Sequence, residues 1–145
     1  MPKQPSRFKY PKFHKSSTIS RVVRRQFKQQ SSSIAICSLE AGRIPSATIE
    51  SMEKTISKIL KDVLKEKGFT LLCRCYPHSP ITKKPAEVRM GGGKGSVDYF
   101  SANIEAGQIL FEINDVSNIN EAVKSCECLN SKSPVKILVI PSVTL

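Results

Sequence analysis

The apolar positions of the chain follow two periods, one typical of helices and one typical of strands. A first stripe, spaced by three and four residues, comprises Ile49, Met52, Ile56, Ile59, Leu60, Val63 and Leu64. A second stripe comprises Ile119, Ala122, Val123, Cys126 and Leu129. Such stripes are typical of amphipathic helices that bury one face. Ser46 is a candidate N-cap of the first helix and Gly68 marks its end, whereas Asn118 with Glu121 predicts a capping box at the start of the second.

Short runs rich in β-forming residues predict the strands. These runs cover residues 34–39, 69–76, 97–104, 108–114 and 135–140. The Glu-Ala-Gly sequence at residues 105–107 predicts a hairpin between the third and fourth runs. Two helices among hairpin-connected strands predict an α+β fold, in which the helices pack on a mixed, largely antiparallel sheet.

The positive charge lies almost entirely at one end of this 145-residue chain. The formal net charge is +11, and residues 1–30 contain nine Lys and Arg side chains and no acid. We therefore expect a basic, extended arm and linker over residues 1–33 and a single α+β domain over residues 34–145. Nine like charges with little apolar surface predict an arm that is disordered alone and ordered by a polyanion such as RNA. A basic, acid-free N-terminus is equally typical of a mitochondrial transit peptide.

The apolar runs and the cysteines argue against several protein classes. No apolar run approaches the ~20 residues of a membrane-spanning helix, and no signal-peptide pattern opens the chain. An odd number of cysteines, Cys37, Cys73, Cys75, Cys126 and Cys128, predicts reduced thiols. The two Cys-x-Cys pairs, with His14 and His78 as spare ligands, allow a zinc site, but structural zinc usually takes Cys-x(2–4)-Cys. Core packing is the favoured role, and no metal or cofactor is expected.

Residues 81–96 form the most unusual segment, with four cations, one acid and four glycines. Glycine lets a backbone approach a ligand closely, so the N–H groups and Lys94 can contact phosphates. A nucleotide-binding P-loop is disfavoured, because Val88 stands at its first glycine, Gly95 stands at its hydroxyl position and no clear strand precedes it. A flexible glycine hairpin without a ligand is the plainer alternative. Cations on both sides of the glycines favour a nucleic-acid backbone as the ligand.

The segment at residues 80–95, PITKKPAEVRMGGGKG, closely resembles the signature of the bacterial-type large-subunit ribosomal protein L-sixteen family. Residues 7–15 are similar to that family's basic N-terminal arm, and residues 39–44 are similar to the approach to its first helix. Residues 110–113 and 133–136 resemble its later strands. The resemblance covers nearly the whole chain apart from residues 16–33, which lack the glycines usual in the family.

The resemblance implies a structural, non-enzymatic constituent of the large ribosomal subunit. Such a protein binds large-subunit rRNA, contacts aminoacyl-site tRNA and neighbouring ribosomal proteins, and helps to shape the aminoacyl-tRNA site and the peptidyl-transferase region. Neither a membrane nor a small-molecule substrate is implied. The expected rRNA-binding residues are Arg7, Lys9, Lys12, His14, Lys15, Arg21, Arg24, Arg25, Arg43, Lys83 and Lys84. The loop expected nearest to tRNA contains Arg89, Met90, Gly91, Gly93, Lys94 and Gly95.

Three aromatic residues and one arginine carry further expectations. Phe8, Tyr10 and Phe13, interleaved with the cations of the arm, either stack on splayed bases or anchor the arm on the protein body. Both interpretations stay open. Arg74 is expected to lie solvated on the outer face of its strand.

Several features depart from the family pattern and bear on the compartment. Gly92 stands where the family usually has a lysine, and the Cys-x-Cys pairs are atypical. Such departures from the family's usual residues favour an organellar ribosome. We expect a mitochondrion rather than a bacterial cytoplasm or a plastid. Because residues 7–15 already resemble the mature arm, no cleavable presequence is expected.

Two other function classes remain as alternatives. A free-standing RNA-binding assembly or regulatory factor would share the basic arm and the α+β body. An enzyme is disfavoured, because His14 and His78 have no evident acid, base or nucleophile as a partner.

Overall fold

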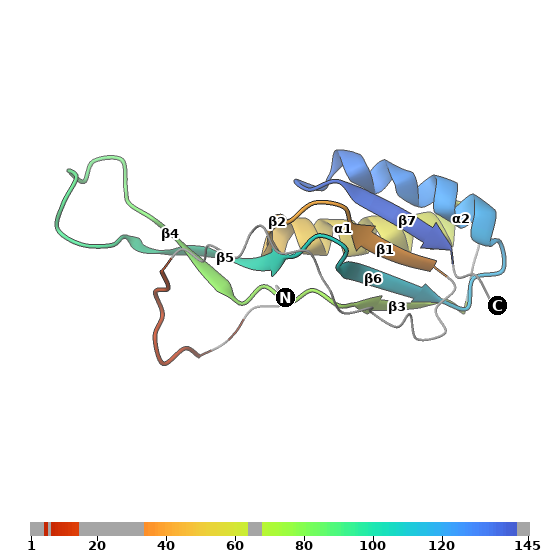
Figure 1. Cartoon of the computed structure of the whole chain (residues 1–145), viewed down its shortest axis with the longest axis horizontal. Helices are drawn as coiled ribbons and strands as arrows, with labels where there is room; N and C mark the ends of the chain where they lie inside the picture. The colour runs from red at the N-terminus through yellow and green to blue at the C-terminus, as the bar shows by residue number, and fades with distance from the viewer. Residues whose placement is uncertain (1–4, 6, 15–33, 64–67, 142–145) are drawn as a thin grey trace.

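The computed structural model describes residues 5, 7–14, 34–63 and 68–141, and it has the α+β architecture that the sequence predicted (Figure 1). The strands of these residues are β1 (Ile34–Ser38), β2 (Gly42–Pro45), β3 (Thr70–Cys73), β4 (Ser79–Lys83), β5 (Ser96–Ile104), β6 (Ile109–Asn114) and β7 (Ile137–Pro141). The helices are α1 (Ser46–Lys58) and α2 (Ile119–Cys126). A π-helical turn (Ile59–Val63) follows α1, and a 3-10 turn (Glu127–Ser131) follows α2.

Four strands form the sheet of the body, in the order β3-β6-β1-β7, with antiparallel pairing throughout. Ala35 of β1 lies opposite Glu112 of β6 on one side and Ile140 of β7 on the other. Because side chains alternate along a strand, Ile34 and Ile36 point to the other face, where both are fully buried.

Both helices cover that other face of the four-stranded sheet (Figure 1). Met52 and Ile56 of α1 and Cys126 of α2 pack in one core with Ile36 and Phe111 of the sheet. The two predicted apolar stripes are therefore confirmed over the described residues. Neither helix of the described chain is long and apolar enough to cross a membrane.

The predicted start of the first helix is wrong by one residue, and the predicted start of the second is confirmed. Pro45, with φ −61° and ψ 149°, occupies the N-cap position of α1, so Ser46 is the first helical residue rather than the cap. Pro45 already has the extended conformation that an N-cap requires, because it ends strand β2. Asn118 does cap α2, but its side chain makes no capping hydrogen bond. The helix α1 ends at Lys58, and the residues before Gly68 lie outside the described chain.

A second sheet of three antiparallel strands, in the order β2-β5-β4, extends from the body as a long β4–β5 hairpin (Figure 1). The strands β2 and β4 were not predicted from the sequence. The expectation that no clear strand precedes the glycine loop is wrong, because β4 leads into it. Pro45 and Pro80 explain the omission, since proline argues against a strand unless that strand lies at an edge. Both β2 and β4 are edge strands, with β5 between them.

The predicted hairpin between β5 and β6 is also wrong. Glu105 accepts a hydrogen bond from the backbone N–H of Gln108 at 3.2 Å, and Gly107 has φ +83°, so the turn itself forms. However, β5 pairs with β2 and β4, whereas β6 pairs with β1 and β3. The turn therefore carries the chain from one sheet to the other.

Candidate nucleic-acid interface

The loop between β4 and β5 lies at the end of the hairpin farthest from the helices (Figure 1). Its side chains are exposed, and the apolar Met90 and Val88 are 101% and 54% exposed. Arg89 lies between them and is exposed as well. The hairpin thus holds these side chains away from the body, where a large partner has access to them.

The glycines of this loop have two different structural roles. Gly91, Gly92 and Gly93 have φ values of +99°, +66° and +97°, and the space around each is open. A side chain at such a φ costs roughly 1–2 kcal/mol, so these glycines permit the turn. A Cβ on Gly95 would lie 2.5 Å from the carbonyl oxygen of Lys83, so this glycine permits the close approach of the loop to β4.

The loop gathers positive charge around a hollow of about 370 Å³. Lys84, Arg89 and Lys94 line this hollow together with the four glycines of the loop. The Lys84 Nζ donates a hydrogen bond to the carbonyl oxygen of Gly91 at 2.6 Å, which ties the two sides of the loop together. None of the ion pairs among the described residues involves a cation of this loop. The charge is therefore available to an anionic partner.

Residues 7–14 of the arm lie against this hairpin. The ring of Phe8 stacks on Phe100 of β5, with centroids 5.6 Å apart and an interplanar angle of 8°. Phe13 meets Phe8 edge-on, also at 5.6 Å. Aromatic packing in this part of the arm therefore opposes the repulsion between its cations. Of the two interpretations left open, Phe8 and Phe13 anchor the arm on the protein.

Two lysines join the arm to the loop in a reciprocal way. The Lys12 Nζ donates to the carbonyl oxygen of Lys94 at 2.9 Å, and the Lys94 Nζ donates to the carbonyl oxygen of Phe13. Tyr10, by contrast, is 67% exposed, and its ring lies under the Nζ of Lys9 at 5.7 Å. Tyr10 thus keeps a face available for a base.

The structure brings together most of the predicted site residues that it describes. Arg7, Lys9, Lys12 and His14 are exposed on the arm, beside the hairpin that carries the loop. Arg43 is half-buried on β2, opposite Asn103 of β5, at the base of the same sheet. The remaining predicted residues, Lys15, Arg21, Arg24 and Arg25, lie outside the described chain.

An ion pair on the side of the four-stranded sheet opposite the helices was not indicated by the sequence pattern. The Arg74 Nη2 lies 2.7 Å from the Glu112 Oε2, and the Glu112 side chain is 3% exposed. The expectation that Arg74 is merely solvated is therefore wrong. The feature of the sequence that could have indicated this ion pair is the single acid, Glu112, in the apolar run of residues 109–113. Burial, and secondarily the charge of Glu112, raises the pKa of the Cys37 thiol on the neighbouring strand.

The core-packing interpretation is confirmed for Cys73, Cys75 and Cys126, but it is wrong for Cys128. Cys75 is 4% exposed and Cys126 is fully buried, whereas Cys128 on the following turn is exposed. The Sγ atoms of Cys73 and Cys75 lie 3.6 Å apart on the core side of β3. Burial, assisted by the nearby Cys128, raises the pKa of Cys126 to about 11, which keeps this thiol protonated.

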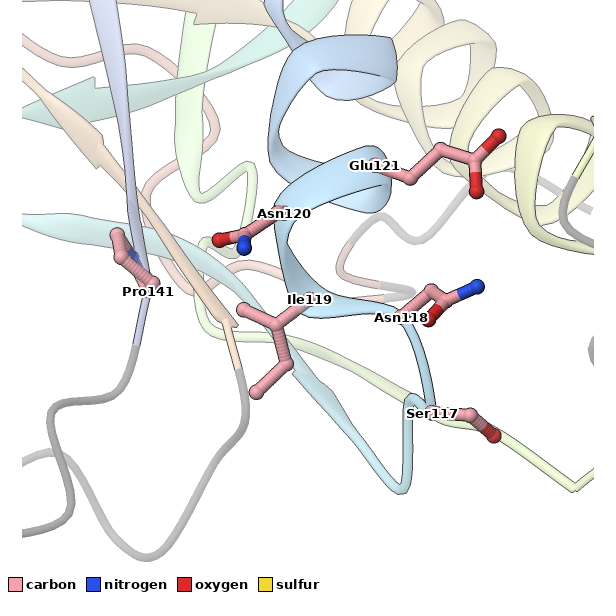
Figure 2. Close-up of a pocket in the computed structure, with 6 residues that line it drawn as sticks. All are labelled: Ser117, Asn118, Ile119, Asn120, Glu121 and Pro141. Atoms are coloured by element: carbon pink, nitrogen blue, oxygen red, sulfur yellow. The ribbon is translucent and has the colours of Figure 1, made fainter.

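A second hollow, of about 520 Å³, lies at the start of α2. Figure 2 shows Asn120 pointing toward Pro141, while Glu121, Asn118 and Ser117 point the other way. Its lining contains no Lys or Arg, and its one charged side chain is an acid. This hollow does not suit a phosphate, so the arm and the β4–β5 loop remain the candidate interface.

Comparison with known proteins supports the family that the loop suggested. A model of the family "Ribosomal protein L16p/L10e" matches residues 5–140, which include the arm, both sheets and both helices.

The chain belongs to the ribosomal protein L16p/L10e family.

Three similar proteins of this family come from bacteria. The "Large ribosomal subunit protein uL16" of Buchnera aphidicola subsp. Cinara cedri is 37% identical over 142 residues, which cover 98% of each chain. The protein of the same name from Acinetobacter baumannii is 37% identical over 137 residues, with 94% and 95% of the two chains covered. That of Acinetobacter baylyi is 36% identical over the same length. The L16p/L10e resemblance thus extends over the full length of these relatives and is not confined to the loop.

Proposed function

We propose that this protein is a structural constituent of the large ribosomal subunit, where it binds large-subunit rRNA and has no enzymatic activity. The observation that carries the proposal is the exposed, cationic β4–β5 loop with the arm packed beside it, in a chain of the L16p/L10e family. The relatives named above are large-subunit proteins, in agreement with this role.

The proposed contacts divide by chemistry. Lys and Arg side chains at phosphates supply affinity that is independent of sequence, while shape selects the site on folded RNA. The proposed rRNA contacts are Arg7, Lys9, Lys12, His14, Lys15, Arg21, Arg24, Arg25, Arg43, Lys83 and Lys84. The loop residues Arg89, Met90, Gly91, Gly93, Lys94 and Gly95 are proposed to lie nearest to the aminoacyl-site tRNA and to help shape the peptidyl-transferase region.

Arg89 is the side chain with the largest proposed role. It lines the loop hollow and is exposed, and a planar guanidinium both stacks on bases and bridges phosphates. Replacing Arg89 with alanine should slow tRNA accommodation or subunit maturation and leave the melting temperature unchanged. Lys58→Ala, an exposed lysine on α1, is the matched control. A lowered melting temperature with normal translation would contradict the proposal.

The proposed organisation is an arm and linker over residues 1–33, fully ordered only on RNA, and one α+β domain over residues 34–145. For the compartment we infer a mitochondrial ribosome. The absence of glycine between Lys15 and Gly42 and the Cys-x-Cys pairs depart from the family pattern and favour this placement. Because the similar proteins are bacterial, a bacterial cytoplasm is the alternative, with a plastid as the third possibility.

Sucrose-gradient sedimentation of a tagged copy, at low and at high salt, tests the proposal. The protein should migrate with the large subunit at about one copy per particle and should resist high salt. The fraction in which it is found, mitochondrial or cytosolic, distinguishes the compartments. Migration as a light species, or release at modest salt, would favour a free-standing RNA-binding assembly or regulatory factor.

A further inference from the structure

The contacts between the arm and the hairpin raise the question of what they do before RNA is present. Phe8 is half-buried between Phe100 and Phe13, so it touches both the hairpin and the arm itself. Stacked and edge-on pairs are the two favoured geometries of aromatic rings. Phe8 therefore closes a small aromatic cluster that fixes the path of residues 8–13 over β5.

This cluster holds like charges together. Lys12 and Lys94 donate to each other's segments, so their ammonium groups lie at the same junction of arm and loop. An ammonium has three donors, and each of these two ammonium groups donates one hydrogen bond across the junction. Two neighbouring cations repel one another, and the aromatic packing opposes that repulsion. The remaining donors and both charges are left for an anion that binds across the junction.

We propose that the Phe8–Phe100 stack preforms one continuous cationic surface from the arm and the β4–β5 loop, which then binds the RNA phosphate backbone as a unit. The proposal rests on the proposed function and deepens it. Phe8 and Phe100 are positioning residues in this scheme, since they act through Lys12 and Lys94. A flexible arm loses conformational freedom when it binds, whereas an arm already seated on the hairpin has lost much of it beforehand.

The stack predicts a distinctive pattern of RNA binding. Removing it should lower the affinity roughly 3- to 10-fold, the range expected for one aromatic pair. The salt dependence should stay unchanged, because its slope follows the number of phosphates neutralised. Lys12→Ala, by contrast, should reduce the slope of the salt dependence, since it removes a cation.

A first experiment tests the seated arm without RNA. Trypsin must take the side chain of Lys12 into its specificity pocket to cut before Phe13, and that side chain is engaged with Lys94. Phe8→Ala in the full chain should therefore speed this cut about 3- to 10-fold, as followed by mass spectrometry. Tyr10→Ala, which removes an exposed ring of the same arm, is the matched control and should have no effect.

A second experiment measures binding of the same variants to purified bacterial large-subunit rRNA over a salt series. Phe8→Ala and the double variant should lose affinity to the same extent, because Phe8 takes part in both aromatic pairs. Phe100→Ala should lose affinity by the same amount or less, because the Phe8–Phe13 pair remains. Phe8→Tyr should restore it, and the melting temperature of Phe8→Ala should match the unaltered protein.

The outcomes separate this inference from the proposed function. An unchanged cutting rate in Phe8→Ala, or faster cutting with unchanged affinity, would overturn the preformed surface. A reduced salt slope in Phe8→Ala would overturn it too, because phosphate contacts would then depend on Phe8 directly. If the unaltered protein failed to bind rRNA, the proposed function would be wrong, and the inference that depends on it would be wrong as well. The trypsin experiment would still show whether the arm is packed on the hairpin.

Discussion

The body and the hairpin are built on opposite principles. In the body, side chains from the four-stranded sheet and both helices meet in one core, where Phe111, Met52 and Cys126 are at most 1% exposed. The β4–β5 hairpin has exposed cations and glycines at its tip, and the arm is attached to it by three phenylalanines. Buried apolar packing therefore lies in one region and exposed positive charge in the other.

This separation means that changes in the two regions should have different readouts. A change in the core should alter the free energy of unfolding and affect function only through the amount of folded protein. A change at the hairpin tip should affect RNA contacts and leave unfolding almost unaltered, since few buried contacts depend on it. Each prediction below tests one side of this comparison.

The largest expected effect is in the core of the body. Phe111→Ala removes a side chain that is 1% exposed and should lower the free energy of unfolding by about 3–5 kcal/mol. Val88→Ala, at an exposed loop position, is the control and should stay within about 0.5 kcal/mol. Urea denaturation measures both. Comparable losses in the free energy of unfolding of the two variants would contradict the contrast between body and hairpin.

The next effect is an alkaline loss of stability in the body. The pKa of Cys126 is raised by burial from its ordinary 9.0 to about 11. The contribution of this thiol to the free energy of unfolding is fully present below pH 9.0. It is lost as the pH rises through about 11, because the thiol ionises at a lower pH in the unfolded chain than in the folded protein. The loss should amount to roughly 2–3 kcal/mol. Thermal denaturation between pH 8 and 11 should show the step in the unaltered protein, and a step that persists in Cys126→Ala would assign it to another group.

A smaller effect concerns the ion pair on the side of the sheet opposite the helices. Arg74→Ala leaves the Glu112 carboxylate buried without this partner, which should cost about 2 kcal/mol, since the half-exposed Arg74 is partly screened by solvent. Pairing Arg74→Ala with Glu112→Gln should recover part of the loss. Chemical denaturation of the two single variants and the double variant forms the cycle. Equal stability of Arg74→Ala and the unaltered protein would show that Glu112 finds another partner.

The smallest effect is expected in the hairpin itself. Gly95→Ala places a Cβ 2.5 Å from the carbonyl oxygen of Lys83, which should cost roughly 1–2 kcal/mol as the strand ends shift apart. Gly68→Ala is the matched control, because its Cβ meets nothing within 4 Å. Hydrogen exchange of β4 amides should report a local opening in Gly95→Ala, with exchange in β1 unaltered. Faster exchange in both strands would mean that hairpin and body unfold together.

The candidate site was only partly predictable from the sequence. The cations and glycines of the loop are contiguous, so their clustering follows from the order of residues alone. The contacts of Lys12 with Lys94 and of Phe8 with Phe100 join positions far apart in the chain, and no local pattern indicates them. The contacts of residues 7–14 with the hairpin were not predicted for this reason. The ion pair was missed because Arg74, just after β3, and Glu112 of β6 are far apart in the sequence.

The sequence by itself determined both helices, most of the strands and the family, because helical periodicity, β-rich runs and the loop signature are all local. The tertiary structure decided the pairing of strands. Pro45 and Pro80 lie in strands because β2 and β4 are at sheet edges, where no ladder donor is required. Likewise, β5 and β6 separate after a well-formed turn because each has a better-matched neighbour elsewhere. A turn is determined by about four consecutive residues, whereas the choice of a partner strand depends on which side chains the whole domain buries.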